Sequence, residues 1–583
     1  MPNDCVMPIA PWLEITEGAA PILLIAPHGG RAGAAASSVL HPKVNDLHTD
    51  EITRELASKL GATALINSGM DRNTLDCNRV GQLANQAPWL LEMIAQRLED
   101  LVARHGRALA LMIHGWNVIE PRIDFGLGLK AGGGIFRAHG AARVSASDAF
   151  IHGPLKNLAD RLRENGIIPS VGLRYPGGGS QNLLQAFTER FSDSPIAAVR
   201  RLSLLAATGA INALQLELSV AVRWPGNLRR RCVEILADTF SRPSTPRQAR
   251  TPITIVRGAS KPQLPRKPKP KAALPARLGM EMFDPVARIG VIASFDLGPG
   301  ANGARFIILL DGSRIALFTS EGKPTYDSER IARGPLAMRH DGERISLGFN
   351  GPALLSPDSI GYLRVEDSLA AGTLQETAEI AVSMRPHSTT NLSGLLAALQ
   401  QPASFNASSV AFGAVTGRIA VDGANQNIEA IGRVGRSFST LGNEKFSSRQ
   451  MLWAYFPGYP APSALEAVRL TYRDGSSESR VRAFAGGEIS PVALESFELE
   501  APSAEASRNH ISALIVNPDG SESLLAGDAE VFLPLSRPGP DLCRVHTWLG
   551  FARFRFEGHE GAGMFEYSSC IEASGEASDA AED

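Results

Sequence analysis

The 583-residue chain has few cysteines, no long apolar run and almost no net charge. Its five cysteines are scattered and form no CxxC pair, which argues against a disulfide scaffold and predicts a reducing, cytoplasmic location. No stretch reaches the roughly 18 consecutive apolar residues that a membrane-spanning helix needs. The formal net charge of -2 predicts no general attraction to nucleic acid or to an anionic membrane. We therefore expect a small-molecule substrate as the partner.

Short apolar runs alternate with helical stretches through the first 240 residues. In residues 49–60, apolar residues recur at every fourth position, with Thr49 as the expected N-cap and Gly61 as the stop signal. The apolar runs are PILLIA (21–26), ATALIN (62–67), ALALMIHGW (108–116), IIPSVGL (167–173) and INALQLELSV (211–220). This alternation predicts an α/β domain over residues 1–240 with a largely parallel sheet.

The composition changes after this region. Residues 241–276 are rich in proline and basic residues, which is typical of an extended linker. Beyond residue 277, short alternating segments are separated by Asp-Gly pairs, a strong hairpin signal. They predict an all-β half made of barrels or sandwiches in tandem, over residues 277–415 and 416–572. Residues 573–583 are acidic and predict a disordered tail.

Two histidines end apolar strands and are each followed by glycine, namely His28 and His114. Ligand sites of parallel sheets lie outside the carboxyl ends of the strands, so both imidazoles can point into one crevice. A catalytic zinc site takes three protein ligands and a water molecule. Asp46, in the loop before the helix at 49–60, is the first choice for the third ligand. Glu51 is the second choice, because the helix dipole already explains an acid in the first helical turn.

A glutamate interrupts the last apolar strand of this domain. Burying Glu217 is costly unless it is paired or functional. Beside a metal, it can remove a proton from bound water and return it to a leaving amine. Arg79 has a planar guanidinium that suits a substrate carboxylate, although it can instead pair with Asp76. The glycine-rich loop 174–182 allows the backbone to approach a ligand closely.

The remaining basic residues of this domain leave two readings open. Arg174 and Arg223 are typical of surface or salt-bridge residues, although either can also line the substrate pocket. We include Arg174, Gly178 and Gly179 among the predicted substrate-binding residues, together with Asn78 and Arg79.

Six motifs in order resemble the N-formylglutamate amidohydrolases and, more distantly, the zinc carboxypeptidases. They are PHGG, DLHT, LDCNR, IHGW with DFGLG, YPGGG and LQLEL, within residues 15–240. The resemblance implies a three-layer α/β/α fold and a zinc-dependent amide hydrolase. Carried over by position, its metal ligands are His28, Asp46 and His114, its catalytic glutamate is Glu217, and its substrate-carboxylate pair is Asn78 with Arg79. The chain departs from the family at two positions, where glycine replaces the serine that commonly follows each histidine.

Two segments of the β half resemble lipocalin-like proteins related to carotenoid hydratases. They are residues 415–438 and 558–569. Those proteins usually carry an Asp-His-Ser-Trp-Gly run where this chain reads VGRSFST, so the acid/base residues are missing. The resemblance implies a non-catalytic barrel pair that binds an apolar ligand or shapes the substrate entrance.

These observations lead to one main hypothesis and two alternatives. The main hypothesis is an amidohydrolase that uses zinc or another divalent metal to cleave an N-formyl amino acid, an N-acyl amino acid or a γ-glutamyl-type amide. The first alternative is a protein that binds an apolar ligand in its β half and keeps a degenerate hydrolase domain. The second is a hydratase or isomerase that acts on a terpenoid-like substrate through His546 or Glu566 of the β half.

Overall fold

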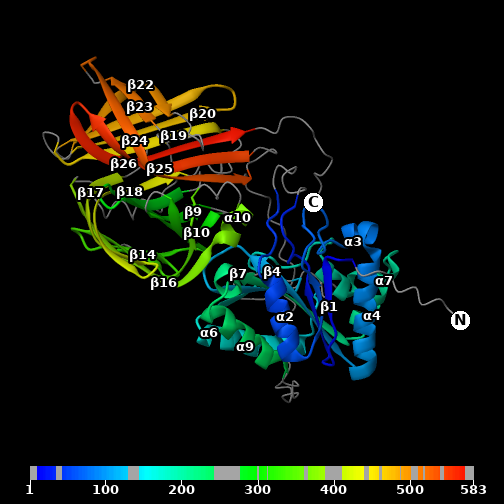
Figure 1. The fold of residues 1–583 in the computed structure, drawn as a ribbon. Coiled ribbons are helices and arrows are strands. Elements are labelled where there is room, and N and C mark those ends of the chain that lie inside the picture. The colour runs from blue at the N-terminus through cyan, green and yellow to red at the C-terminus, as the bar shows by residue number, and fades with distance from the viewer. Residues whose placement is uncertain are drawn as a thin grey trace, which may run out of the picture. The chain divides into compact units, whose positions relative to one another are not determined.

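The chain divides into two compact units in this computed structural model (Figure 1). Unit 1 contains Met1–Ala36, Lys43–Asn117 and Pro121–Ala273, and unit 2 contains Ser37–Pro42, Val118–Glu120 and Leu274–Asp583. The structure describes residues 10–33, 42–128, 144–241, 276–298, 301–310, 313–327, 329–359, 365–387, 410–438, 446–458, 463–485, 488–499, 510–516, 519–538 and 544–571. The predicted linker, apart from its two ends, and the predicted acidic tail lie outside these residues.

A seven-stranded sheet forms the centre of unit 1. Its strands are β1 (Leu13–Thr16), β2 (Ile22–Ala26), β3 (Thr63–Asn67), β4 (Ala108–Trp116), β5 (Arg122–Gly126), β6 (Ile168–Val171) and β7 (Ile211–Ser219). Their order is β1-β3-β2-β4-β7-β5-β6. The four central strands β3, β2, β4 and β7 are parallel, whereas β1 and β5 pair antiparallel with their neighbours β3 and β7. All five apolar runs of the sequence therefore form strands, and β1 and β5 are additional.

Helices cover both faces of this sheet (Figure 1). They are α2 (Thr49–Leu60), α3 (Val80–Gln86), α4 (Pro88–His105), α5 (Asp148–Phe150), α6 (Lys156–Glu164), α7 (Ala197–Ala207), α8 (Val220–Arg223) and α9 (Asn227–Ser241), with a π-helical turn at Ile151–Leu155 and 3-10 turns at Leu183–Phe187 and Glu189–Phe191. Leu24 of β2 packs into one core with α2, α6 and α9, whereas Leu23 and Ile25 pack into another with α4 and α7. Side chains alternate across a strand, so the central strands are buried on both sides. Unit 1 thus has the three layers that the resemblance implies.

The N-cap of helix α2 lies one residue earlier than the sequence predicts. His48, not Thr49, is the N-cap, with a left-handed backbone at φ 67°, and Thr49 is the first helical residue. The Thr49 hydroxyl donates a hydrogen bond to the backbone oxygen of Asp46, 2.6 Å away, which ties the helix start to the preceding loop. The helix stops at Gly61 as predicted, with φ 60°.

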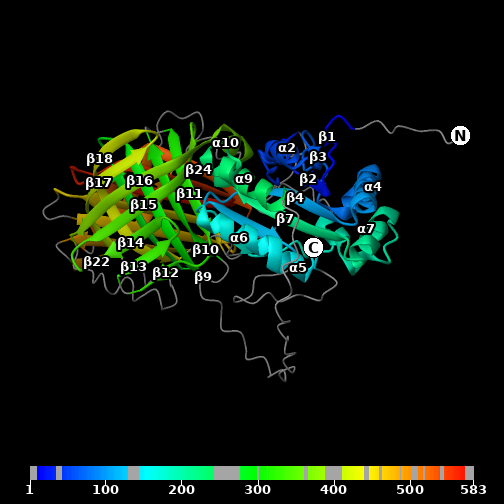
Figure 2. The same cartoon turned by 90° about the horizontal axis from the view of Figure 1, so that it is seen from below.

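Unit 2 is built from strands, as the Asp-Gly pairs predict. The first sheet contains β8 (Ala276–Asp284), β9 (Ile289–Gly298), β10 (Ala301–Leu310), β11 (Arg314–Glu321), β12 (Thr325–Tyr326), β13 (Arg330–Arg333), β14 (Leu336–His340), β15 (Ile345–Ser356), β16 (Thr373–Pro386), β17 (Val410–Val421) and β18 (Ala424–Phe438), with helix α10 (Val365–Ala371) between β15 and β16 (Figure 2). Strand β11 also pairs with β15, so the sheet curls back on itself. Asp422 and Gly423 both have positive φ and turn β17 into β18, as a tight hairpin requires.

Eight further strands form a closed barrel. They are β19 (Phe446–Phe456), β20 (Ser463–Tyr472), β21 (Ser477–Ala485), β22 (Glu488–Leu499), β23 (His510–Val516), β24 (Glu522–Pro538), β25 (Arg544–Phe556) and β26 (His559–Ile571). The predicted boundary at 415/416 falls inside β17, and β17 and β18 belong to the first sheet. The change of sheet therefore lies between β18 and β19. Strand pairing, which the sequence pattern does not reveal, assigns β17 and β18 to the first sheet.

The barrel packs on the first sheet through one of its two faces. Leu452 and Ala454 of β19 belong to a core made by barrel strands alone, whereas Met451, Trp453 and Tyr455 share a core with residues of the first sheet. Strand side chains alternate between faces, so one strand contributes to both cores.

A buried group of charges also joins the sheet to the barrel. Glu466 of β20 accepts hydrogen bonds from Arg433 of β18, at 2.5 Å, and from Arg482 of β21, with Arg480 3.5 Å away. Arg433 also donates to Glu281 of β8 at 2.9 Å. Burial by itself raises the pKa of Glu466, but the charges of the three arginines outweigh it and lower this pKa to about 2.

Replacing Glu466 with glutamine should destabilise unit 2 strongly. The change leaves three guanidinium groups around a neutral amide, and breaking a buried ion pair costs about 3–5 kcal/mol. Urea unfolding of the full chain, followed by circular dichroism, measures this loss. The control is Glu379→Gln, which removes an exposed ion pair with Arg418 and should cost about 0–1 kcal/mol. Equal midpoints for the two variants would contradict the role given to this network.

Two further expectations concern cysteine and the membrane. Cys77 and Cys232 are buried and free, and Cys570 is disulfide-bonded. One disulfide is not a disulfide scaffold, so it does not contradict the prediction that such a scaffold is absent. None of the helices in the described part of the chain has the length and apolar character needed to cross a bilayer.

Candidate metal centre

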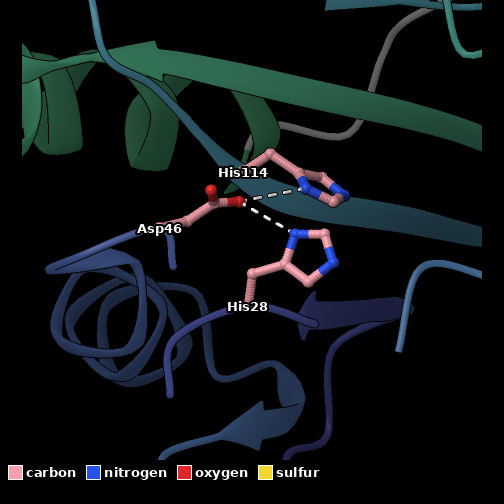
Figure 3. Close-up of side chains that lie close together, drawn as sticks. All are labelled: His28, Asp46 and His114. Atoms are coloured by element: carbon pink, nitrogen blue, oxygen red, sulfur yellow. Dashed lines mark hydrogen bonds and ion pairs between the residues drawn. The ribbon is translucent and has the colours of Figure 1, made fainter. Parts of the chain in front are cut away.

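Three predicted ligands meet at the edge of the sheet in unit 1 (Figure 3). His28 lies two residues beyond β2, His114 lies near the end of β4, and Asp46 lies in the loop before α2. The parallel pairing of β2 with β4 brings the two strand ends side by side. The backbone N–H of Asp46 donates to the carbonyl oxygen of His28 at 2.8 Å, which holds the loop against the strand end.

The ligand atoms of these residues converge on one point. Both Nδ1 atoms face the same oxygen, Oδ2 of Asp46, at 3.1 Å for His28 and 3.3 Å for His114. One ligand atom from each residue lies within 4.8 Å of the other two, and all three side chains are buried. Two imidazoles and a carboxylate are a donor set that zinc accepts in catalytic sites. The group can therefore hold a metal ion.

The hydrogen bonds of His28 fit metal binding. Its Nε2 lies 2.7 Å from Oδ1 of Asp76, while its Nδ1 faces Asp46. A neutral imidazole donates from only one ring nitrogen. If Nε2 donates to Asp76, the lone pair of Nδ1 is directed at the centre of the group, which is the usual arrangement of a metal-binding histidine. His114 keeps its Nε2 buried without a hydrogen-bond partner among the described residues.

Asp46 and Asp76 are both held in their charged form. Burial by itself raises the pKa of Asp46, but His28, His114 and Arg72 reverse this and lower it well below its usual value. Arg72 donates from Nη1 to Oδ1 of Asp46 at 3.3 Å, which leaves Oδ2 directed at the two histidines. The pKa of Asp76 is likewise lowered, because His28, Arg72 and Lys43 outweigh its burial.

Glu217 lies on the neighbouring strand β7 in register with His114 of β4. Its side chain is buried, and Oε1 accepts a hydrogen bond from Nε2 of Gln215 at 2.6 Å. Burial is the main cause that raises its pKa to about 7. A carboxyl group with a pKa near neutrality can both accept and release a proton, which is what a general base and acid must do.

Asp124 is a residue of this region that the sequence analysis missed. It lies on β5 in register with Glu217 and is fully buried. Its carboxylate accepts hydrogen bonds from the Ser170 hydroxyl and from the backbone N–H groups of Leu173, Arg174 and Tyr175, at 2.8 to 3.1 Å. Asp124 therefore fixes the start of the glycine-rich loop beside the last strands of the sheet. The DFGLG motif, which begins with Asp124, was the available signal.

The predicted substrate-binding residues lie in two places. Asn78 and Arg79 follow Asp76, and Arg79 forms an isolated bridge with Asn182 at the end of the glycine-rich loop. The guanidinium of Arg79 is 43% exposed and lies 3.7 Å from Asp76, which is the ion pair considered as the alternative. The Oδ1 atom of Asn78 is buried without a partner among the described residues.

The remaining predicted substrate-binding residues belong to the glycine-rich loop. Arg174 contacts Asp124 through its backbone N–H, and its side chain is exposed. Gly178 and Gly179 lie further along this loop, where Gly178 approaches the backbone of Gly128.

Glu51, the second choice for a metal ligand, does not belong to the cluster. Its carboxylate lies 3.1 Å from His48 and 2.8 Å from Arg229, on the outer side of the first turn of α2. The direction of the Glu51 side chain explains the difference, because its carboxylate is turned toward His48 and Arg229 and not toward the strand ends. Asp46 is therefore the acidic residue that the fold brings to the two histidines.

The glycine after His28 is explained by its surroundings. A Cβ atom at Gly29 would lie 2.5 Å from the backbone oxygen of Asn67 and 2.8 Å from Cβ of Asp50. A side chain at this position would not fit against β3 and α2 without a shift. The glycine is therefore required by packing.

Comparisons with known proteins identify similar folds only. No protein-family model and no curated protein matches the chain. The N-formylglutamate amidohydrolase from Ralstonia eutropha JMP134 is similar over 39% of this chain and 95% of its own, with 12% identity and a TM-score of 0.25. Kievitone hydratase from Nectria haematococca is similar over 51% of this chain and 90% of its own, with 9% identity and a TM-score of 0.33. CghA, in its structure with Sch210972, is similar over 52% of this chain and 90% of its own, with 10% identity and a TM-score of 0.32.

Proposed function

We propose that unit 1 is a zinc-dependent amidohydrolase. The observation that carries this proposal is the convergence of His28, Asp46 and His114 on one point, with Glu217 on the adjacent strand. The motif order of the sequence, which resembles the N-formylglutamate amidohydrolases, assigns the same four residues. Zinc or another divalent metal would be held by the three ligands.

The reaction that fits these residues is the addition of water to an amide. A metal ion in such a site polarises a carbonyl group and lowers the pKa of water. Glu217 takes the proton from the attacking water and delivers it to the amide nitrogen as the C–N bond breaks. The products are a carboxylate and a free amine. Oε1 of Glu217 is held by Gln215, so we assign the proton transfer to Oε2.

The substrate is expected to carry a carboxylate. Arg79 has a half-exposed guanidinium with one long ion pair, so most of its hydrogen-bond donors are available for a ligand. A guanidinium binds a carboxylate through two parallel hydrogen bonds. We assign Asn78 and the loop residues Gly178, Gly179 and Arg174 to the same substrate. N-formyl amino acids, N-acyl amino acids and γ-glutamyl-type amides are the substrate classes that meet these requirements.

The test uses the purified full chain and two measurements. Elemental analysis should find a divalent metal close to equimolar with the protein, and amine release from N-formyl-glutamate or N-acetyl-glutamate should stop on chelation and return with added zinc. The matched control is the same compound with its carboxylates esterified, which should react much more slowly. A chain that holds no metal and stays inert with added zinc would count against the proposal.

The two alternatives have less support. A degenerate hydrolase domain would have its site residues splayed apart, whereas here the ligand atoms converge. A hydratase in the β half would need an acid/base pair, but the register of β25 with β26 directs His546 and Glu566 to opposite faces of the barrel wall. Glu566 is moreover engaged by Arg449 at 3.3 Å. For unit 2 we retain the proposal of a tandem lipocalin-like pair that binds or gates an apolar group of the substrate.

A further inference from the structure

Arg223 is a buried cation near two acids, Asp46 and Glu217, whose charges act on it without a direct ion pair. It ends the short helix α8, which follows β7 directly, and its side chain is fully buried. Among the described carboxylates, none forms an ion pair with it. Burying a guanidinium costs free energy unless its N–H groups form hydrogen bonds. The contacts of Arg223 therefore indicate what keeps it in this place. The expectation of a surface or salt-bridge residue is therefore wrong for Arg223, and the alternative that it lines the substrate pocket stays a prediction.

The hydrogen bonds of Arg223 join segments that carry the site. Nη1 donates to the backbone oxygen of Leu47 at 2.9 Å, and Nη2 donates to Oδ1 of Asn117 at 2.7 Å. Leu47 follows Asp46 directly, and Asn117 lies three residues after His114. Arg223 itself lies six residues after Glu217. One side chain thus connects the loop of one ligand, the strand of another and the strand of the proposed base.

The backbone beneath Arg223 is kept free of side-chain atoms. A Cβ atom at Gly115 would lie 2.2 Å from Nη1 of Arg223 and 3.0 Å from Cβ of Asp46. The guanidinium therefore occupies the space that a side chain at position 115 would need. Gly115 and Arg223 form one packed arrangement beside the ligands.

We propose that Arg223 is a positioning residue that holds Asp46 and His114 in the geometry needed for metal binding. This inference rests on the proposed function. Arginine suits the role because its rigid fork reaches two acceptors at once, whereas a lysine ammonium lacks this fork. The residue does not touch the reacting atoms, so its effect passes through the ligands.

The test measures metal binding in the full chain, independently of turnover. Arg223→Met removes both hydrogen bonds, and Gly115→Ala displaces the guanidinium without removing it. Competition with a chelator should show about 10- to 100-fold weaker zinc binding in both variants, as for other residues that orient metal ligands. Arg223→Lys should fall between these variants and the wild type. The visible spectrum of the cobalt-substituted protein should change, because it reports the coordination geometry.

The control is Arg161→Met. This change removes a partly exposed arginine that donates hydrogen bonds to Thr239 and Asp238 elsewhere in unit 1. It should leave zinc affinity and the cobalt spectrum unchanged. If circular dichroism shows that Arg223→Met is unfolded, the zinc affinities of Gly115→Ala and Arg223→Lys test the role of Arg223. Folded variants that bind zinc like the wild type overturn the role of Arg223 alone. A wild-type chain that binds neither zinc nor cobalt overturns the proposed function and this inference together.

Discussion

Glu217→Gln is expected to lower kcat by about 100- to 10,000-fold, the range that general acid–base catalysis contributes. Glutamine has nearly the same shape and keeps an oxygen that can accept the hydrogen bond from Gln215, so the strand should not change. It cannot take the proton of the attacking water. Zinc content should stay at the wild-type level, because Glu217 is not among the three converging ligands.

The pH dependence of the reaction checks the same residue. Glu217 must be deprotonated to act as a base, so kcat should rise with pH through its pKa and level off above it. Burial raises this pKa to about 7, and a bound cation would favour the charged carboxylate and lower it. The acidic limb should therefore lie at or below about pH 7 and disappear from the residual activity of Glu217→Gln. A variant that keeps more than a tenth of the wild-type kcat would rule out this assignment.

His114→Ala is expected to remove both the bound metal and the activity. Losing one of three ligands leaves His28 and Asp46, and zinc in catalytic sites normally has three protein ligands. The loss of affinity should far exceed the roughly 10- to 100-fold effect of the residues that orient ligands. Elemental analysis after dialysis measures the metal content, and chelator competition measures the remaining affinity.

A nearby histidine supplies the control for this prediction. His48 precedes α2 and bonds Glu51, but it does not belong to the converging group. Its backbone has φ 67°, which asparagine tolerates better than most residues, so His48→Asn is the suitable change. This variant should bind zinc like the wild type. If His48→Asn loses the metal while His114→Ala keeps it, the ligand set proposed here is wrong.

Much of unit 1 could be predicted from local patterns. Apolar runs of strand length, helical periodicity and terminal glycines indicated β2, β4, β7 and α2, because each of these signals lies within one short segment. The two histidines were found because each lies at the carboxyl end of such a run and is followed by glycine. Asp46 was preferred over Glu51 on the argument that a loop residue can turn inward, and the structure brings Asp46 to the histidines.

Other features depend on contacts that the patterns do not contain. Asp124 was missed because its partners are backbone N–H groups of a loop about 50 residues further on. The boundary at 415/416 was misplaced because strand pairing, not composition, assigns β17 to the first sheet. Arg223 was taken for a surface or salt-bridge residue, with pocket lining as the alternative, because its sequence neighbours give no indication of its two acceptors.

The amino-acid sequence by itself determined the order of strands and helices in unit 1, the β character of unit 2 and the residue types available for a metal site. These follow from periodicity and from turn residues, which act over a few positions. Only the tertiary structure decided which acid joins the histidines, and that a buried arginine lies over Gly115 beside them. The reason is that strand register and loop packing bring together side chains from β2, β4 and β7, and distances between such segments are not encoded in any one of them.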